Sequence, residues 1–265
     1  MVTLKIRGLS VDLKWWSFPG GERNVKIANQ LFISTTDAAE ITCNFKGSDD
    51  LIDLLLLVNA VRNIISNELH LVIPYFPFAR QDRVMTEGEP FALQVAAQLI
   101  NSCNFKTVEV WDPHSDVLAG MFAPGVLQIV PQWEIWNVQV RISASLMRSA
   151  LVSPDAGALK KIYKLAMNTG LPVIEASKRR DVSTGEIVET LISGDLDQYQ
   201  RLIVVDDICD GGRTFIELAN TIRKTGYNGD LVLCVTHGIF SKGLEPLSVY
   251  DKVYTINNMN SSITL

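Results

Sequence analysis

The sequence predicts an α/β protein with two domains, each built on a parallel β-sheet flanked by helices. Short apolar runs typical of buried strands alternate with helical patterns in both halves of the chain, and this alternation favours parallel sheets that are covered on both faces. Polar clusters directly follow several of these runs, at the strand ends where such sheets bind ligands. A length of 265 residues suits two domains of ordinary size.

In the first half of the chain, the clearest elements are two strands with a helix between them. Leu69–Pro74 is an apolar run of strand length, and Phe91–Cys103 repeats its apolar residues with the period of a helix. Thr107–Trp111 is the next predicted strand, and it leads into the polar segment Asp112–Asp116. These elements follow the order expected for a parallel sheet.

The second half of the chain repeats this order. The predicted strands are Ala150–Ser153, Leu171–Glu175, Leu202–Val205 and Leu231–Val235, and the predicted helices are Ala158–Thr169 and Ile216–Thr225. Gly226 is expected to cap the second helix at its C-terminal end. Because Trp133–Val140 has no strong periodicity, the boundary is placed there, and we expect domains at residues 1–136 and 137–265.

The composition excludes several classes of protein. A net charge of −5 argues against general nucleic-acid binding, which leaves a basic footprint. No two of the four cysteines have the spacing of a CxxC pair, as expected for reduced thiols in the cytosol. The N-terminus lacks a signal-peptide core, and the longest apolar run, Leu51–Ala60, is too short to span a membrane. We therefore expect a cytoplasmic protein that binds small molecules, with neither nucleic acid nor membrane as a partner.

The residues that follow Leu202–Val205 predict a site for a ribose that bears a phosphate. Two carboxylates at the strand end suit vicinal hydroxyls, and the glycine-containing turn after them opens a helix, where backbone N–H groups favour an anion. A helix cap with a surface turn is the structural alternative, but it leaves the strand-end acids unexplained. The candidate residues are Asp206, Asp207, Asp210, Gly211, Gly212, Arg213 and Thr214.

Two polar clusters in the first half suit phosphates or a metal. Arg80 and Arg83, with Gln81 and Asp82 between them, can hold a polyphosphate and fix each other's orientation. An exposed ion-pair network is the alternative there. In the second cluster, His114 precedes Asp116 by two residues, and the imidazole and the carboxylate can share a metal or its waters. Because magnesium prefers oxygen ligands, His114 alone is weak support for a metal site.

Two further clusters lie in the second half. Asp155 follows a predicted strand, where it either caps the next helix or serves a binding site. Ser177–Asp181 contains Lys178, Arg179 and Arg180 and precedes a polar, glycine-containing stretch. A solvated basic hairpin is the default interpretation of such a charge run.

Six motifs between Phe18 and Phe240 resemble those of the ribose-phosphate diphosphokinase family and occur in the family's order. The chain is identified as a member, which implies two domains of the type I phosphoribosyltransferase fold. The resemblance implies that Lys178 and Arg180 act on the transferred diphosphate from a mobile loop, and that His114 and Asp155 serve magnesium. It also implies ATP binding by Phe18, Glu22, Arg80, Gln81, Asp82 and Arg83.

The family resemblance implies transfer of the β,γ-diphosphate of MgATP to the 1-hydroxyl of ribose 5-phosphate. In the family, the turn that resembles Phe18–Glu22 contacts adenine from a neighbouring subunit, so we expect a homo-oligomer with the ATP site at a subunit interface. Gly20 stands where the family has an acid, and Val84 where it often has a lysine. The match fades over the last 25 residues or so, and this departure concerns regulation more than catalysis.

The phosphate turn itself departs from the family pattern at two positions. Gly211 replaces a threonine, and Arg213 replaces a glycine. If Arg213 points into solvent, ribose 5-phosphate remains the expected acceptor; if it points inward, ADP-ribose becomes an alternative acceptor for the same chemistry. Two further hypotheses are a phosphoribosyltransferase, which leaves Arg80–Arg83 without a role, and a non-catalytic family member that regulates an active partner.

Overall fold

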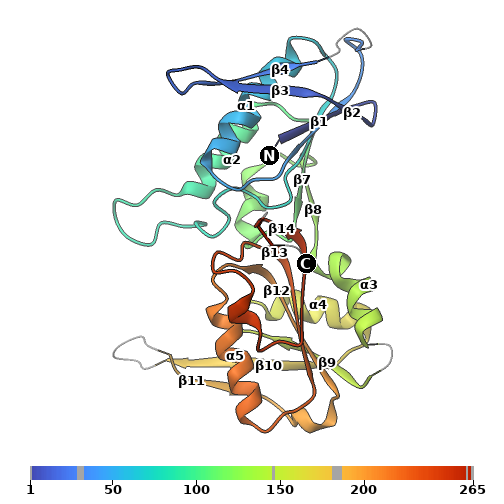
Figure 1. Ribbon diagram of the computed structural model, residues 1–265, viewed down its shortest axis with the longest axis vertical. Helices are drawn as coiled ribbons and strands as arrows, with labels where there is room; N and C mark the ends of the chain where they lie inside the picture. The colour runs from blue at the N-terminus through green and yellow to red at the C-terminus, as the bar shows by residue number, and fades with distance from the viewer. Residues whose placement is uncertain (1, 29–32, 145–146, 181–186, 261, 264–265) are drawn as a thin grey trace. The chain divides into compact units, whose positions relative to one another are not determined.

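The computed structural model describes residues 2–28, 33–144, 147–180, 187–260 and 262–263, with the backbone alone for 178–180 and 187–190. The chain divides into two compact units, Met1–Val130 and Pro131–Leu265, coloured blue to green and green to red in Figure 1. The division lies six residues before the expected one at 136/137.

The first unit is built on a six-stranded sheet in the order β2-β1-β5-β6-β7-β8. Strands β5 to β8 are parallel, whereas β1 runs antiparallel to both β2 and β5. Its strands are β1 (Val2–Ile6), β2 (Leu9–Val11), β5 (Ala39–Cys43), β6 (Leu69–Val72), β7 (Thr107–Trp111) and β8 (Leu127–Val130), and its helices are α1 (Ser48–Arg62), α2 (Ala92–Ser102) and the 3-10 helix η2 (Asp116–Met121).

A separate two-stranded hairpin, β3 (Leu13–Ser17) with β4 (Arg23–Ile27), also belongs to this unit. Arg23 fastens it to α1, because its guanidinium donates to both carboxylate oxygens of buried Asp53, at 2.5 and 2.6 Å. The same guanidinium lies over the ring of Trp15. Paired hydrogen bonds of this kind fix geometry as well as adding energy. They therefore hold the hairpin in a defined position on α1.

The second unit has a six-stranded sheet in the order β11-β10-β9-β12-β13-β14. All neighbours are parallel except β11, which is antiparallel to β10. The strands are β9 (Ser149–Ser153), β10 (Val173–Arg180), β11 (Ile187–Ile192), β12 (Arg201–Cys209), β13 (Asp230–Gly238) and β14 (Lys252–Asn258); the helices are α3 (Gln132–Ala144), α4 (Leu159–Thr169), α5 (Arg213–Lys224) and the 3-10 helices η3 (Leu196–Gln198) and η4 (Glu245–Leu247).

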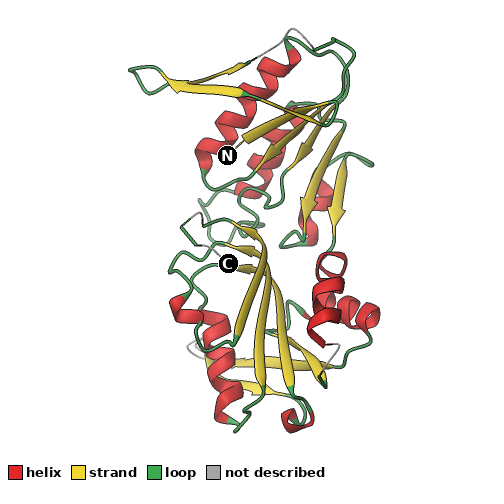
Figure 2. Ribbon diagram, turned by 45° about the vertical axis from the view of Figure 1, so that its right-hand side comes forward, coloured by secondary structure: helices red, strands yellow, loops and turns green. Residues whose placement is uncertain are grey.

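The sheet of the second unit has a hydrophobic core on each face, and Figure 2 shows helices on both sides of it. Along β12, Leu202 and Val204 pack in the cluster that contains the apolar side of α5, while Ile203 and Val205 pack in the cluster of α3 and α4. Every residue from 202 to 205 is fully buried. The continuous apolar run in the sequence therefore reflects a central strand that is covered on both faces.

Two features of the fold differ from the sequence expectations. The segment expected to separate the domains forms α3 instead, and Trp136 is fully buried in the second unit, where its indole N–H donates to Thr236 on β13 at 3.0 Å. The sheets are also not wholly parallel, since β1, β2 and β11 make antiparallel pairs at their edges. The α/β class itself, with helices flanking mostly parallel sheets, is confirmed.

The apolar run at residues 51–60 lies in α1, where Leu54 and Leu57 are fully buried against the rest of the first unit. Among the described residues, no helix has both the length and the apolar character that a membrane span requires.

Candidate active site

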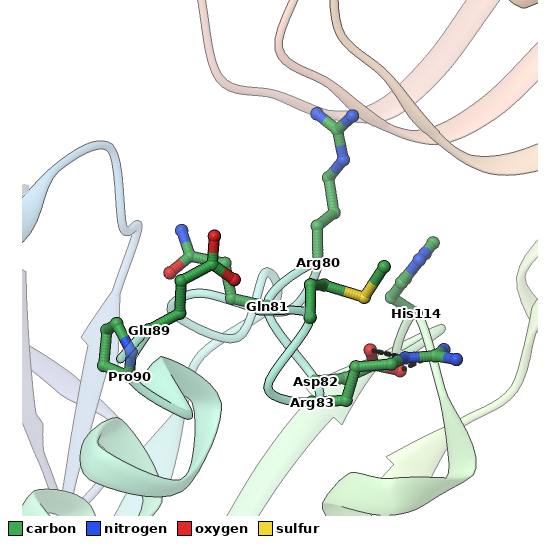
Figure 3. A pocket seen from close by; sticks show the side chains of 8 residues that line it. Arg80, Gln81, Asp82, Arg83, Glu89, Pro90 and His114 are labelled. Carbon is green, nitrogen blue, oxygen red and sulfur yellow. Dashed lines mark hydrogen bonds and ion pairs between the residues drawn. The ribbon is translucent and has the colours of Figure 1, made fainter. Parts of the chain in front are cut away.

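The loop between β6 and α2 and the turn after β7 bring two of the predicted motifs together in the first unit. They line one cavity of about 530 Å³, and Figure 3 shows Arg80 extending away from the Asp82–Arg83 pair while His114 lies on the Arg83 side. The lining residues are Arg80, Gln81, Asp82, Arg83, Met85, Glu89, Pro90 and His114. Arg80 and Arg83 are exposed, whereas Asp82 is buried.

Asp82 holds this cluster together. It accepts hydrogen bonds from Nε and Nη2 of Arg83, at 3.0 and 3.3 Å. These bonds, with smaller contributions from Ser115 and the charge of His114, lower the pKa of the Asp82 carboxyl. A carboxylate that stays ionised keeps the Arg83 guanidinium oriented, so Arg83 is directed by the protein before any phosphate binds.

The backbone is unusual at two positions of this cluster. Phe78, two residues before Arg80, has a φ of 57°, and Asp112, two residues before His114, has a φ of 40°. A left-handed conformation is a true outlier for a bulky residue such as phenylalanine, and such outliers gather at functional sites. The backbone N–H of Asp112 donates to Val130 at 2.8 Å, which fixes the turn that presents His114.

Glu89 belongs to the cavity, although the sequence analysis did not name it. Its carboxylate accepts from the backbone N–H of Thr86 at 3.1 Å, and its own N–H donates to the carbonyl of Thr86. The contact between the Glu89 carboxylate and the Thr86 N–H matches one half of a capping box, and its Thr-x-x-Glu spacing is present in the sequence. The cavity lining thus includes a second carboxylate, Glu89, in addition to Asp82 and the two arginines.

In the second unit, β12 carries the acid pair Asp206 and Asp207 near its C-terminal end and continues to Cys209, beyond the strand expected at 202–205. Asp206 accepts from the backbone N–H of Asp207 at 2.9 Å, and Asp207, which is buried, pairs with Lys161 of α4 at 3.1 Å. Burial, followed by the charges of Asp207 and Asp155, raises the pKa of Asp206 well above its ordinary value. Three acids are therefore gathered at the strand end, with Lys161 as a counter-charge that the sequence analysis missed.

The phosphate turn is shaped by a glycine that cannot be replaced freely. Gly212 has a φ of 77° and begins α5, and a Cβ at this position would lie 2.9 Å from the side chain of Leu247. Only glycine adopts this conformation without strain. The turn therefore leads from the end of β12 at Cys209 into the N-terminus of α5, where backbone N–H groups favour an anion.

Arg213 points into solvent. Its side chain is 88% exposed, and its Nε donates to Glu217 one helical turn later at 2.6 Å. Of the two orientations that the sequence left open, the structure has the outward one. The observation that favoured ADP-ribose as an acceptor is therefore absent, and the comparisons below do not support that alternative either.

Asp155 caps the turn that precedes α4 and not the helix itself, whose N-cap residue, Ala158, has no side-chain cap. The Asp155 carboxylate accepts from the backbone N–H groups of Gly157 and Ala158, at 2.9 and 3.2 Å, just before α4. Its charge also acts on Asp206, so the same carboxylate holds this turn and lies near the acid pair. Among the described residues, no three His, Cys, Asp or Glu side chains form a group that could hold a metal.

The remaining predicted residues lie on hairpins. Phe18 and Glu22 flank the turn between β3 and β4, where the N–H of Phe18 donates to the carbonyl of Glu22 at 2.8 Å and half of Phe18 is exposed. Lys178 and Arg180 lie in β10, paired through the backbone with β11. The other part of the expected catalytic loop, residues 181–186, lies outside the described residues.

Comparisons with known proteins agree with this picture. Residues 5–103 match the family model of the N-terminal domain of ribose phosphate pyrophosphokinase. The chain is 30% identical to a ribose-phosphate pyrophosphokinase of Pyrococcus furiosus, over 96% of this chain and 88% of that protein. It is 28% identical to one of Thermosipho africanus, over 95% of this chain and 79% of that protein. The fold is similar to a phosphoribosylpyrophosphate synthetase structure from Mycobacterium smegmatis, with a TM-score of 0.76 at 20% identity, covering 93% and 87% of the two chains.

Proposed function

Because the chain belongs to the ribose-phosphate pyrophosphokinase family, we propose that it transfers diphosphate from ATP to the 1-hydroxyl of ribose 5-phosphate. The products are phosphoribosyl diphosphate and AMP. The observation that carries the proposal is that the chain has both an arginine-lined cavity after β6 and an acid pair with a phosphate turn after β12. A ribose-phosphate grip alone would suit either a maker or a user of phosphoribosyl diphosphate.

In the proposed reaction, the cavity of the first unit binds the phosphates of ATP. Arg83 is already oriented by Asp82, and Arg80 supplies a second fork of donors from the same loop. Arginine matches phosphate geometry with two parallel hydrogen bonds. Phe18 and Glu22 would contact adenine from a neighbouring subunit, so the proposal includes a homo-oligomer with the ATP site at a subunit interface.

The acid pair of the second unit would hold the ribose hydroxyls. Asp207 is fixed by Lys161, and Asp206 by the backbone N–H of Asp207, so both carboxylates are positioned before the sugar binds. The phosphate turn would receive the 5-phosphate at the start of α5. With the sugar held at both ends, its 1-hydroxyl is left to attack the β-phosphorus of ATP as AMP departs.

Magnesium fits this site through the substrate more than through the protein. The ion usually keeps several waters and takes one or two protein ligands together with substrate phosphates, and the described residues offer no larger cage. His114 and Asp155 are the residues proposed to hold it, directly or through water. When bound, the ion would neutralise charge on the transferred diphosphate.

Lys178 and Arg180 are proposed to stabilise the charge that develops during transfer. Phosphoryl-type transfer depends mainly on positioning and on charge stabilisation, and both cations belong to β10. A simple phosphoribosyltransferase would leave these cations and the arginine cavity without a role.

The proposal is tested by incubating the purified protein with ATP, magnesium chloride and ribose 5-phosphate. We expect AMP and phosphoribosyl diphosphate in equal amounts, measured by ion-exchange chromatography and ³¹P NMR. Reactions without ribose 5-phosphate control for plain ATP hydrolysis. If AMP does not form, the proposed function is wrong; base-dependent release of diphosphate from phosphoribosyl diphosphate would then identify a phosphoribosyltransferase.

A further inference from the structure

We propose that Lys242 binds the 5-phosphate of the acceptor sugar, and that it takes the place that the sequence suggested for Arg213. The inference rests on the proposed function and deepens it, since it names the side chain by which the site recognises a phosphorylated acceptor. Lys242 lies in the segment between β13 and η4, outside every motif considered in the sequence analysis.

The geometry begins at Gly211. A Cβ placed on this glycine would lie 3.5 Å from both Cδ and Cε of Lys242 and 3.8 Å from Cγ. The lysine side chain therefore passes directly over the glycine at van der Waals distance. Its ammonium group is one bond beyond Cε, so it lies beside the turn that precedes the N-terminus of α5.

The backbone that carries Lys242 is tied to the end of β12. Ile239 and Phe240 both donate their N–H groups to the carbonyl of Cys209, at 2.8 and 3.1 Å. The N–H of Gly243 donates to the carbonyl of Phe240 at 2.9 Å, which closes a turn around Lys242, and the Phe240 ring is fully buried. The lysine is thus presented by a turn anchored to the strand that ends in the phosphate site.

The ion-pair partners of the two cations favour Lys242 over Arg213 as the phosphate ligand. Arg213 already has a partner in Glu217 and is directed outward. Lys242 makes no hydrogen bond or ion pair with any residue in the described part of the chain. A cation without a partner beside backbone N–H groups at a helix start provides the two features that favour a phosphate dianion.

The unusual glycine explains why the lysine can lie there. Gly211 does not have a positive φ, so its backbone does not require glycine. An alanine would make an ordinary contact with Lys242, but the branches of a threonine would need the space that the lysine methylenes fill. With glycine in place of the family's threonine, the turn lacks one hydroxyl donor, and the ammonium group of Lys242 would supply a donor from the neighbouring segment.

The test compares Lys242→Gln with the unchanged protein and with Lys224→Gln, which removes an exposed lysine at the far end of α5. Steady-state kinetics gives KM for ribose 5-phosphate and for ATP, and isothermal titration calorimetry gives Kd for ribose 5-phosphate without turnover. We expect KM and Kd for ribose 5-phosphate to rise on the order of tenfold or more in Lys242→Gln, as for loss of a hydrogen bond to a charged group.

Three further results complete the expected pattern. KM for ATP stays the same in Lys242→Gln, Lys242→Arg keeps most of the affinity for the sugar phosphate, and Lys224→Gln behaves like the unchanged protein. Gly211→Thr displaces the lysine and, in combination with Lys242→Gln, adds little further loss. Circular dichroism and thermal melting confirm that each variant is folded.

Equal Kd values for ribose 5-phosphate in Lys242→Gln and the unchanged protein would overturn the inference. That result leaves the proposed function intact as long as the unchanged protein forms AMP. Conversely, if the unchanged protein forms no AMP, the proposed function fails, while the calorimetric comparison still decides whether Lys242 binds the sugar phosphate.

Discussion

The two units place their candidate binding residues on different kinds of support. In the second unit, the acid pair lies on β12, a central strand with neighbours on both sides and a core on each face. In the first unit, Arg80 and Arg83 lie on the long loop between β6 and α2, and both are exposed. Sites on strands are held more precisely than sites on loops. We therefore expect the proposed ribose site to have a fixed geometry and the proposed ATP site to adjust when its ligand binds.

The two sites also differ in charge. Asp155, Asp206 and Asp207 repel one another at the end of β12, and Lys161 offsets only part of that repulsion. The cavity of the first unit instead contains two arginines, one of which is neutralised by Asp82. The proposed acceptor site thus holds like charges close together, whereas the proposed donor site holds positive charge that phosphates would neutralise.

The largest loss of activity is expected at Lys178, a basic residue of the second unit, whose other candidate residues are mostly acidic. Lys178→Ala should lower kcat by about a thousandfold, the scale seen when a cation that contacts a transferred phosphoryl group is removed. ATP binding should remain largely intact, because Arg80 and Arg83 are unchanged. Kd for ATP and kcat for AMP formation measure the two parts separately. Equal activity in variant and unchanged protein would remove Lys178 from the mechanism.

The next largest effect tests the fixed site. Asp206→Asn keeps the acceptor for the Asp207 N–H but removes a negative charge from the ribose grip. We expect kcat/KM for ribose 5-phosphate to fall by about a hundredfold, since hydrogen bonds to charged groups contribute about 1.5–3 kcal/mol each. Asp197→Asn, at an exposed position of η3, is the matched control. A loss in kcat/KM for ATP alone would contradict the assignment of Asp206 to the sugar.

The loop site should tolerate change better. Arg80→Ala is expected to raise KM for ATP by about tenfold, because Arg83 remains oriented by Asp82 and one guanidinium–phosphate interaction is lost. Ribose 5-phosphate affinity should not change. If Arg80→Ala instead abolishes binding of both substrates, the contrast between an adjustable and a fixed site is wrong.

The difference between strand-borne and loop-borne residues also determines which candidate residues could be predicted from the sequence. The candidate residues on β12 and in the turn after it could be named from the sequence, because a buried run followed at once by acids and a glycine-containing turn is a local pattern. Lys161 and Lys242 were missed, since they reach the site from α4 and from the segment after β13, and only folding makes them neighbours. The direction of Arg213 was left open for the same reason: its partner Glu217 competes with an inward orientation, and side-chain direction is not a property of the local pattern.

The sequence analysis also missed strands near the sheet edges and misplaced the domain boundary. β1 alternates buried and exposed residues and carries no continuous apolar run, so a search for such runs passes over it. α3 was expected to be a boundary because its sequence lacks a clear period, yet the burial of Trp136 and Val140 holds it to the second unit. In both cases tertiary packing overrides a weak local signal.

The smallest effect is one of stability, and its sign opposes the effect on activity. The raised pKa of Asp206 means that the folded protein keeps this proton at pH values where the unfolded chain, with an ordinary pKa of about 3.9, has lost it. Stability therefore falls as pH rises from about 4 toward the folded pKa, and Asp206→Asn escapes that loss. We expect the variant to be more stable than the unchanged protein near pH 7.5 and to lose this advantage as the pH approaches 4. Urea unfolding across this pH range measures it, with Asp197→Asn as control. A variant less stable than the unchanged protein at pH 7.5 would mean that Asp206 is not under the charge repulsion inferred for the proposed acceptor site.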